Sequence, residues 1–139
     1  MIILDTNVLS AFMRPTPDRP VIEWLDRQPS ESVWTSSVTI FEMVLGIEIT
    51  PEGRRRAFLQ TALDHLLVEI IEGRILPFDT TAAQAAAVLS ATRRRDGRPQ
   101  ELRDSMIAGI AIARRATLAT RNTRHFADLA ISVVNPWTD

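Results

Sequence analysis

The first ten residues, Met1–Ser10, read MIILDTNVLS and decide the fold. The apolar run Met1–Leu4 is typical of a buried parallel strand. Asp5 ends this run, and because Asp is a preferred helix N-cap residue, Thr6–Met13 is predicted to be a helix that begins there. The chain therefore opens with a strand that leads directly into a helix through an acidic residue.

The rest of the chain repeats this alternation of strand and helix. Further strands are predicted at Val33–Thr35, Arg74–Phe78, Thr117–Ala119 and Ser132–Val134. Helices are predicted at Val21–Arg27, Val38–Ile49, Pro51–Ile71 (with Pro51 in the first turn), Thr81–Arg94 and Leu102–Arg115, and a proline-containing loop at Arg14–Pro20. This order favours one α/β domain over residues 1–139, built on a mainly parallel sheet of four to five strands. Ligands of such sheets bind outside the carboxyl ends of the strands, where Asp5 lies.

The composition excludes several kinds of chemistry. The 139 residues include no Cys and no Tyr, and all 16 basic residues are Arg, so there is no Lys. Without Cys the chain has no disulfide, thiolate nucleophile or Cys-ligated zinc. Without Lys it has neither Schiff-base chemistry nor a P-loop lysine. Carboxylates, hydroxyls, Arg and two His residues remain to carry any reaction.

The charge and hydropathy patterns bear on partners and location. The formal net charge of -1 gives no overall basic excess that would indicate nucleic-acid binding. Local Arg clusters still match phosphate oxygens. No stretch of about 20 apolar residues predicts a membrane span. The N-terminus has no basic segment before its apolar run, which argues against a signal peptide, so we expect a cytoplasmic protein.

Three carboxylates stand on otherwise apolar faces. Asp5 ends a strand, although capping the helix explains it equally well. Glu42 interrupts the apolar helical stripe of Val38, Leu45 and Ile49, with a position at the rim of the core as an equally good explanation. Asp104 lies in the first turn of its predicted helix, where the helix dipole also favours an acid.

The combination is more specific than any one of these acids. Clustered carboxylates repel one another unless a cation joins them. A set of oxygen ligands favours Mg²⁺ or Mn²⁺ over zinc. Such an ion activates water and stabilises an attacked phosphate. The sequence therefore indicates a metal-dependent nuclease.

Three segments match a known family in order and spacing: LDTNVLS from Leu4, TIFEMVLGIE around Glu42, and LRDSMIAGIAIARRATLATRNTRHF from Leu102. Together they resemble the PIN-domain ribonuclease toxins of the VapC type, over essentially the whole chain. The resemblance implies a three-layer α/β/α sandwich and metal-dependent endonucleolytic cleavage of RNA. It also implies a cognate antitoxin, a homodimer, and contact with DNA only indirectly, through an antitoxin complex.

The resemblance also implies site residues. Asp5, Glu42 and Asp104 would be the acidic metal ligands and catalytic residues, with Thr6 and Asn7 beside the first ligand. The family often has a fourth acid where this chain has Asn122. An amide carries no charge, so this departure weakens a second metal site and favours one Mg²⁺ or Mn²⁺ ion.

Arginines near the matching segments offer phosphate contacts. We predict that Arg98, Arg103 and Arg121 contact the RNA backbone. Arg93–Arg95 are slightly more typical of cations on a solvated face at a helix C-terminus than of a phosphate track that leads to the acids.

The remaining charged and aromatic residues are less informative. Arg54–Arg56 lie near a predicted helix start, and we expect them to pair with Glu52 or with an acidic partner. His65 and His125 are typical of structural or surface histidines. The tryptophans are typical of core or interface positions rather than of base-stacking platforms: Trp24, Trp34 and Trp137.

Two alternative functions agree with part of the sequence. A haloacid-dehalogenase-type phosphatase also begins with an Asp after a strand, but it needs a second acid where this chain has Asn7, and a Lys. A catalytically silent PIN-like domain that binds RNA or protein is the stronger alternative, and Asn122 mildly favours it.

Overall fold

The N-terminal strand, β1 (Ile2–Leu4), is the central strand of the sheet in the computed structural model, which describes all 139 residues. It is flanked by β2 (Val33–Ser36) and β4 (Thr117–Ala119). The outer strands are β3 (Ile75–Leu76) and β5 (Val133–Val134), which give the order β3-β2-β1-β4-β5. All four pairings are parallel, as predicted for this alternation of strands and helices.

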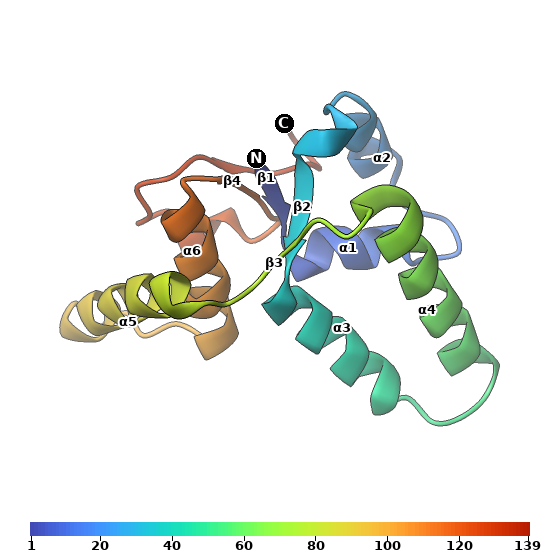
Figure 1. Ribbon diagram of the computed structural model, residues 1–139, viewed down its shortest axis with the longest axis horizontal. Helices are drawn as coiled ribbons and strands as arrows, with labels where there is room; N and C mark the ends of the chain where they lie inside the picture. The colour runs from blue at the N-terminus through green and yellow to red at the C-terminus, as the bar shows by residue number, and fades with distance from the viewer.

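Helices cover both faces of the sheet. The main helices are α1 (Thr6–Phe12), α2 (Arg19–Asp26), α3 (Ser37–Glu48), α4 (Arg54–His65), α5 (Thr80–Arg95) and α6 (Leu102–Arg114). Three short helical segments complete the chain: η1 (Ser30–Ser32), η2 (Leu66–Ile71) and η3 (Thr123–Phe126). In Figure 1, α5 and α6 lie on one side of the strands and α1, α2 and α4 on the other. This arrangement confirms the expected three-layer α/β/α sandwich.

Side chains alternate between two cores along each strand. Ile3 and Leu118 belong to the core under α5 and α6, whereas their neighbours Leu4 and Ala119 belong to the core under α1, α2 and α4. All four residues are buried. This period of two is the expected one for a strand covered on both faces.

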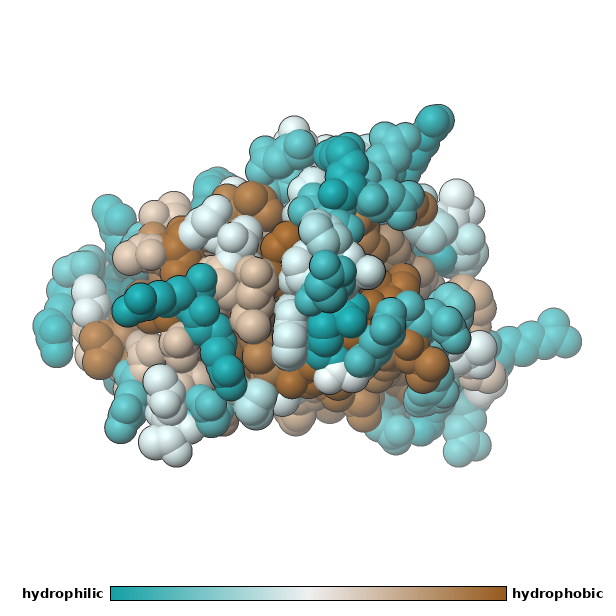
Figure 2. Space-filling model, turned by 45° about the horizontal axis from the view of Figure 1, so that its top comes forward, coloured by the Kyte–Doolittle hydropathy of each residue, from teal (hydrophilic) through white to brown (hydrophobic).

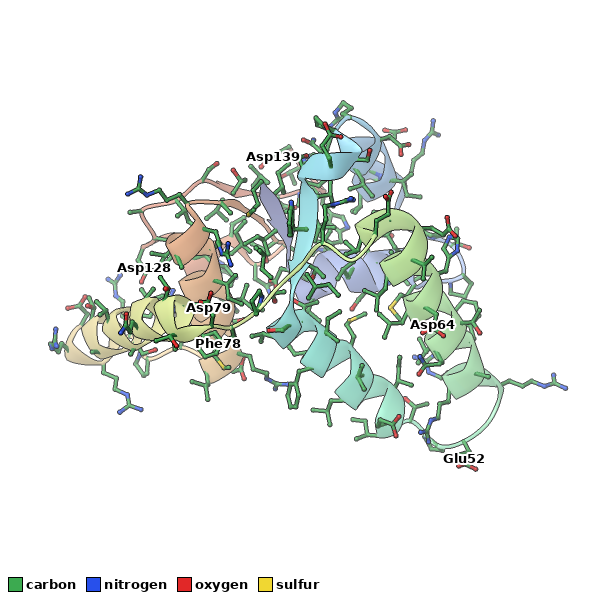
Figure 3. The ribbon with its side chains drawn as sticks, in the orientation of Figure 1. Glu52, Asp64, Phe78, Asp79, Asp128 and Asp139 are labelled. Atoms are coloured by element: carbon green, nitrogen blue, oxygen red, sulfur yellow. The ribbon has the colours of Figure 1, made fainter.

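Short polar side chains begin the helices next to the sheet. The Asp5 carboxylate accepts a hydrogen bond from the Thr6 backbone N–H, the Ser36 hydroxyl accepts one from Thr39, and Asp79 caps α5 at Ala82. Figure 3 shows Asp79 at the start of α5. Asp5 therefore has the capping role that its sequence context predicts.

The helix boundaries differ most from the prediction at the starts of α2 and α4. Helix α2 begins at Arg19, inside the predicted loop, because Pro20 is compatible with a first helical turn. Pro51 does not begin the next helix. Gly53 has φ +152° and ψ -168°, a conformation open essentially to glycine alone, and α4 begins only after it. The predicted helix then continues to Ile71, but its last six residues form a π-helix.

Two further features concern packing and hydropathy. Gly109 allows a close approach between α6 and α5. A Cβ built on Gly109 would lie 2.5 Å from the Ala82 carbonyl oxygen and 2.7 Å from the Ala86 Cβ. No helix combines the length and the apolar character needed to cross a bilayer.

Candidate active site

Asp5 is the most constrained carboxylate in the structure. Its side chain lies at the carboxyl end of β1, and the residue is only 4% exposed. One oxygen, Oδ1, accepts the Thr6 N–H at 2.8 Å, and Oδ2 accepts the Thr120 hydroxyl at 2.8 Å and the Asn7 amide at 3.4 Å. These donors fix both oxygens before any ligand binds.

Burial raises the pKa of the Asp5 carboxyl from 3.8 to about 6, and the negative charges of Asp104 and Glu42 add to the rise. The hydrogen bonds from Thr120 and Thr6 act in the opposite direction, because they stabilise the ionised form. A bound cation would relieve the electrostatic repulsion among the three carboxylates.

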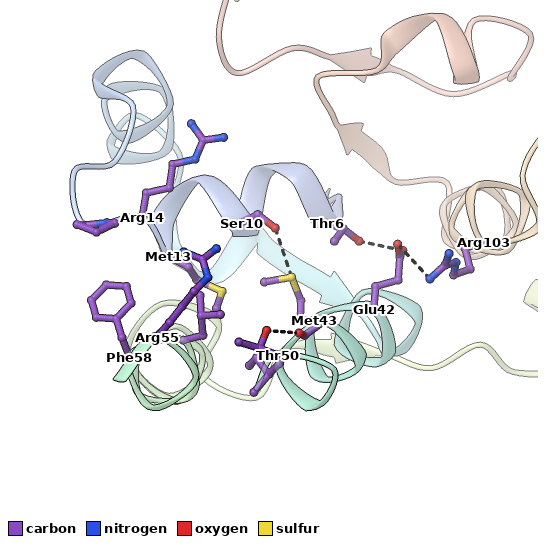
Figure 4. A pocket seen from close by; sticks show the side chains of 14 residues that line it. Thr6, Ser10, Met13, Arg14, Glu42, Met43, Thr50, Arg55, Phe58 and Arg103 are labelled. Carbon is purple, nitrogen blue, oxygen red and sulfur yellow. Dashed lines mark hydrogen bonds and ion pairs between the residues drawn. The ribbon is translucent and has the colours of Figure 1, made fainter. Parts of the chain in front are cut away.

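Glu42 projects from α3 and is partly buried, with 23% of its side chain exposed. Its Oε1 accepts a hydrogen bond from the Thr6 hydroxyl at 3.0 Å, and Arg103 of α6 lies 3.9 Å from Oε2. Figure 4 shows this Thr6–Glu42–Arg103 chain. Burial is the largest cause that raises the pKa of Glu42, and the Thr6 hydroxyl and Arg103 lower it. The cation that the sequence of α3 lacks is thus supplied by another helix.

Asp104 lies in the first turn of α6, with 21% of its side chain exposed. Its Oδ2 lies 3.0 Å from Nδ1 of His125, which belongs to η3. His125 is exposed, as expected, but it contacts a proposed metal ligand rather than solvent alone.

One cavity of about 380 Å³ brings the predicted residues together. It lies at the carboxyl end of β1, and its lining includes the three acids and the three predicted supporting residues: Asp5, Glu42, Asp104, Thr6, Asn7 and Asn122. All atoms of these side chains that could bind a metal ion are oxygens, and such a ligand set is typical of Mg²⁺ or Mn²⁺. No three His, Asp or Glu side chains converge closely enough to hold one ion. The oxygen chemistry of the lining fits the metal, but the separation of the three carboxylates does not form a closed site, so their role as ligands stays a prediction.

A second cavity of about 480 Å³ adjoins the first between α1, α3 and α4. Both cavities share Thr6 and Glu42, and Figure 4 shows Arg55 and Phe58 at the far end from Glu42. Arg103 lines this second cavity. A groove that leads to the acids is therefore bordered by cationic side chains.

Sequence reasoning missed Thr120. This residue is fully buried, donates to Asp5 and accepts hydrogen bonds from Asn7 and from the Asn122 backbone N–H. Its position directly after β4 could have placed Thr120 beside Asp5, because the carboxyl ends of adjacent parallel strands meet at one edge of the sheet.

The arginines divide by position. Arg103 and Arg121 line the two cavities, whereas Arg98 lines neither and lies near Asp128, whose pKa its charge helps to lower. Arg56 pairs with Glu48 at 2.8 Å. The expected partner of the Arg54–Arg56 segment, Glu52, lies instead in the loop between α3 and α4 (Figure 3).

The expectation that Arg93 lies on a solvated face is wrong. Its side chain is 2% exposed and forms a two-pronged ion pair with Asp128, both contacts measuring 2.9 Å. It also donates to the Ser105 hydroxyl at 3.2 Å and to the His125 carbonyl at 2.7 Å. Figure 3 shows Asp128 on the α5–α6 side of the molecule. Arg93 thus ties η3 and α6 to α5, a long-range role that its sequence neighbours do not indicate.

A family model described as the PIN domain matches residues 2–132 of this chain. The chain belongs to the PIN-domain family. Among curated PIN-domain relatives, the VapC ribonuclease Y4jK of Sinorhizobium fredii is 36% identical over 137 residues, which cover 99% of this chain and 98% of the relative. The toxin FitB of Neisseria gonorrhoeae is 36% identical over 139 residues, with both chains fully covered.

Solved structures agree with this PIN-domain assignment. A chain in the structure of FitAB bound to an IR36 DNA fragment superposes with a TM-score of 0.89 and 35% identity, covering 100% of this chain and 97% of the other. The PIN-domain resemblance of the three sequence segments is thereby confirmed, together with the fold.

Proposed function

We propose that this PIN-domain protein is the ribonuclease toxin of a toxin–antitoxin pair. The observation that carries the proposal is the placement of Asp5, Glu42 and Asp104 around one cavity at the carboxyl end of the central strand. The relatives named a VapC ribonuclease and a toxin support it. Retention of all three acids speaks against a catalytically silent PIN-like domain.

The proposed reaction is endonucleolytic hydrolysis of an RNA phosphodiester. Asp5, Glu42 and Asp104 would hold one Mg²⁺ or Mn²⁺ ion, which supplies activation of water and stabilisation of charge on the attacked phosphate. Asn122 adds an uncharged amide to the same cavity, which favours one ion rather than two.

The protein's own side chains set the positions of these acids. Thr6 contributes its N–H to Asp5 and its hydroxyl to Glu42, so one residue orients both carboxylates. Thr120 holds the other Asp5 oxygen. His125 holds Asp104. Such preset hydrogen bonds limit the reorganisation that ligand binding requires.

Arg103 and Arg121 are the proposed contacts for RNA phosphates, because each lines a cavity beside the acids. Guanidinium groups bind phosphate oxygens in a paired geometry. Arg98 lies near Asp128 and lines neither cavity, so we do not propose it as a phosphate contact.

The proposed protein partners are a cognate antitoxin and a second copy of this chain. The similar FitAB structure contains DNA, and we propose that DNA reaches this toxin only through such an antitoxin complex. Figure 2 shows apolar side chains at the surface between hydrophilic ones. Large exposed apolar residues include Phe41 (58%) and Leu102 (68%), which line one apolar cavity between α3 and α6 and suit a homodimer contact. We propose that the protein acts in the cytoplasm.

The test is cleavage of total RNA by the purified protein. Cleavage is expected with Mg²⁺ or Mn²⁺ and not in EDTA, and Asp104→Asn should abolish it. The matched control is Asp64→Asn, an exposed acid of α4 that is labelled in Figure 3 and lines neither cavity. Equal cleavage in EDTA would refute the metal role. RNA binding without cleavage would instead support the silent domain.

A further inference from the structure

The acid-lined cavity has one aromatic side chain at its rim. Trp137 is the only apolar residue of the lining, which otherwise consists of acids, hydroxyls, amides and two arginines. Trp137 comes from the C-terminal segment after β5, whereas Asp5 and Asn7 come from the N-terminus. Trp137 packs partly against the core, as expected from the sequence, but it also reaches the rim of this cavity, which neither that expectation nor the metal-ligand role proposed for the acids explains.

Polar contacts fix the Trp137 ring. Its Nε1 donates to Asp18 Oδ2 at 2.9 Å, and its backbone N–H donates to the Asn135 side chain at 2.9 Å. Asp18 also accepts from Arg14, a second residue of the cavity rim, at 3.3 Å. The ring also packs partly against the core under α1 and α2.

The Trp137 ring also contacts a cation. The Arg121 guanidinium carbon lies 4.7 Å from the ring centroid, a cation–π distance, and the residue is exposed. The Arg121 backbone N–H donates to Asn7 Oδ1 at 3.1 Å, and the Asn7 amide in turn contacts Asp5. The stacked pair is thus joined to the proposed catalytic carboxylate through one residue.

We propose that Arg121 and Trp137 form a seat for one unstacked nucleobase of the RNA substrate, next to the phosphodiester that is cleaved. Single-stranded RNA is bound by stacking of its bases on aromatic rings and on Arg guanidinium planes. An uncharged base is also compatible with a cavity whose carboxylates repel phosphate. The inference rests on the proposed nuclease function and adds a contact that selects unpaired RNA.

The test measures binding of short single-stranded oligoribonucleotides that span a cut site mapped with the wild-type protein. Binding is measured in the Asp104→Asn background, which prevents cleavage. Each oligonucleotide is compared with versions that lack one base beside the cut phosphate. Loss of the seated base should weaken binding by about tenfold, in the range found when a stacking aromatic is removed. A 2-aminopurine base at that position should lose fluorescence on binding.

Substitutions of Trp137 and Arg121 test whether these two residues bind the base. Trp137→Leu should weaken binding of the intact oligonucleotide to the level of the abasic one and should abolish the 2-aminopurine quenching. Arg121→Leu, at an exposed position that does not endanger folding, should reduce both effects. The matched control is Arg124→Leu, an exposed arginine of the following segment that does not line the cavity.

The outcomes separate the seat from the proposed function. Cleavage by the wild-type chain together with equal binding of intact and abasic oligonucleotides at every position would overturn the seat alone. Weaker binding by Arg121→Leu that is the same for intact and abasic RNA would show that Arg121 makes only the phosphate contact proposed above, and would overturn the seat. Absence of any cleavage by the wild-type chain would overturn the proposed function and the seat with it.

Discussion

Asp5→Asn is expected to make the protein more stable while it abolishes cleavage. The pKa of Asp5 is 3.8 when exposed and about 6 in the fold. One pKa unit corresponds to about 1.4 kcal/mol, so ionised Asp5 costs the folded state about 3 kcal/mol at neutral pH. An uncharged side chain of the same shape removes this cost.

Proton linkage gives the direction in which the effect of Asp5→Asn on stability changes with pH. Because folding raises the pKa of Asp5, the folded state binds a proton that the unfolded state has already released between about pH 4 and 6. The wild-type protein therefore loses the stability associated with this group as the pH rises through that range. The gain from Asp5→Asn should be near zero at about pH 4 and reach its full value above about pH 6.

Hydrogen bonding reduces this gain. Asn retains one carbonyl oxygen to accept the Thr6 N–H, but its amide faces the Thr120 hydroxyl and the Asn7 amide, which now donate to Asp5. Each of these two mismatched contacts costs about 1 kcal/mol, so a net gain of about 1 kcal/mol is expected at neutral pH.

The assay is urea unfolding in EDTA across this pH range, with Asp64→Asn as the control that should show no such trend. Added Mg²⁺ should stabilise the wild-type protein and not Asp5→Asn, because only the former retains the full acidic set. A loss of stability in Asp5→Asn at neutral pH, or a gain that does not depend on pH, would refute the reasoning about Asp5.

Three other substitutions test the packing and the hydrogen bonds described above. Arg93→Leu should lower the free energy of unfolding by about 3 kcal/mol in urea titration, because it removes the hydrogen bonds that a buried guanidinium donates to Asp128, Ser105 and His125; a change below about 1 kcal/mol would contradict its role in joining α5, α6 and η3. Gly109→Ala should cost about 2 kcal/mol through overpacking against α5. Gly46→Ala, with nothing within 4 Å of its new Cβ, should instead add about 0.5–1 kcal/mol, and equal effects of the two would disprove the packing account. Thr120→Val removes a hydrogen bond that lowers the pKa of Asp5, so the lower half-point of the pH profile of cleavage should move to higher pH; an unchanged profile would refute that coupling.

The fold was predictable because its signals are local. The Met1–Leu4 run, the capping Asp5 and the repeated strand–helix order determine a parallel α/β sheet, and the structure has it. Periodicity does not report the end of an element, and for that reason α4 was predicted to begin at Pro51 rather than after Gly53. The backbone conformation of one glycine, which depends on the loop as a whole, determined that boundary.

The acids of the candidate site were predictable for a related reason. A carboxylate on an apolar stripe is conspicuous in a sequence, and the family motifs agree on the same three positions. Their partners are not conspicuous. Thr120, Arg93 and Trp137 are ordinary residues in ordinary segments, and only the meeting of distant strands and helices gives them neighbours. Long-range contacts carry no periodic signal.

The position of β1 in the sheet has a consequence for synthesis. During synthesis β1 is made before β4, one of its two neighbours in the sheet, which begins only at Thr117, and Thr120 and Trp137 follow β4. A nascent chain therefore lacks an assembled cavity until Trp137 has left the ribosome. The activity proposed for this cavity would be absent while the segments before it are being made. Protease digestion of ribosome-stalled chains, with protection of the N-terminal strand expected only after β4 has emerged, would test this timing.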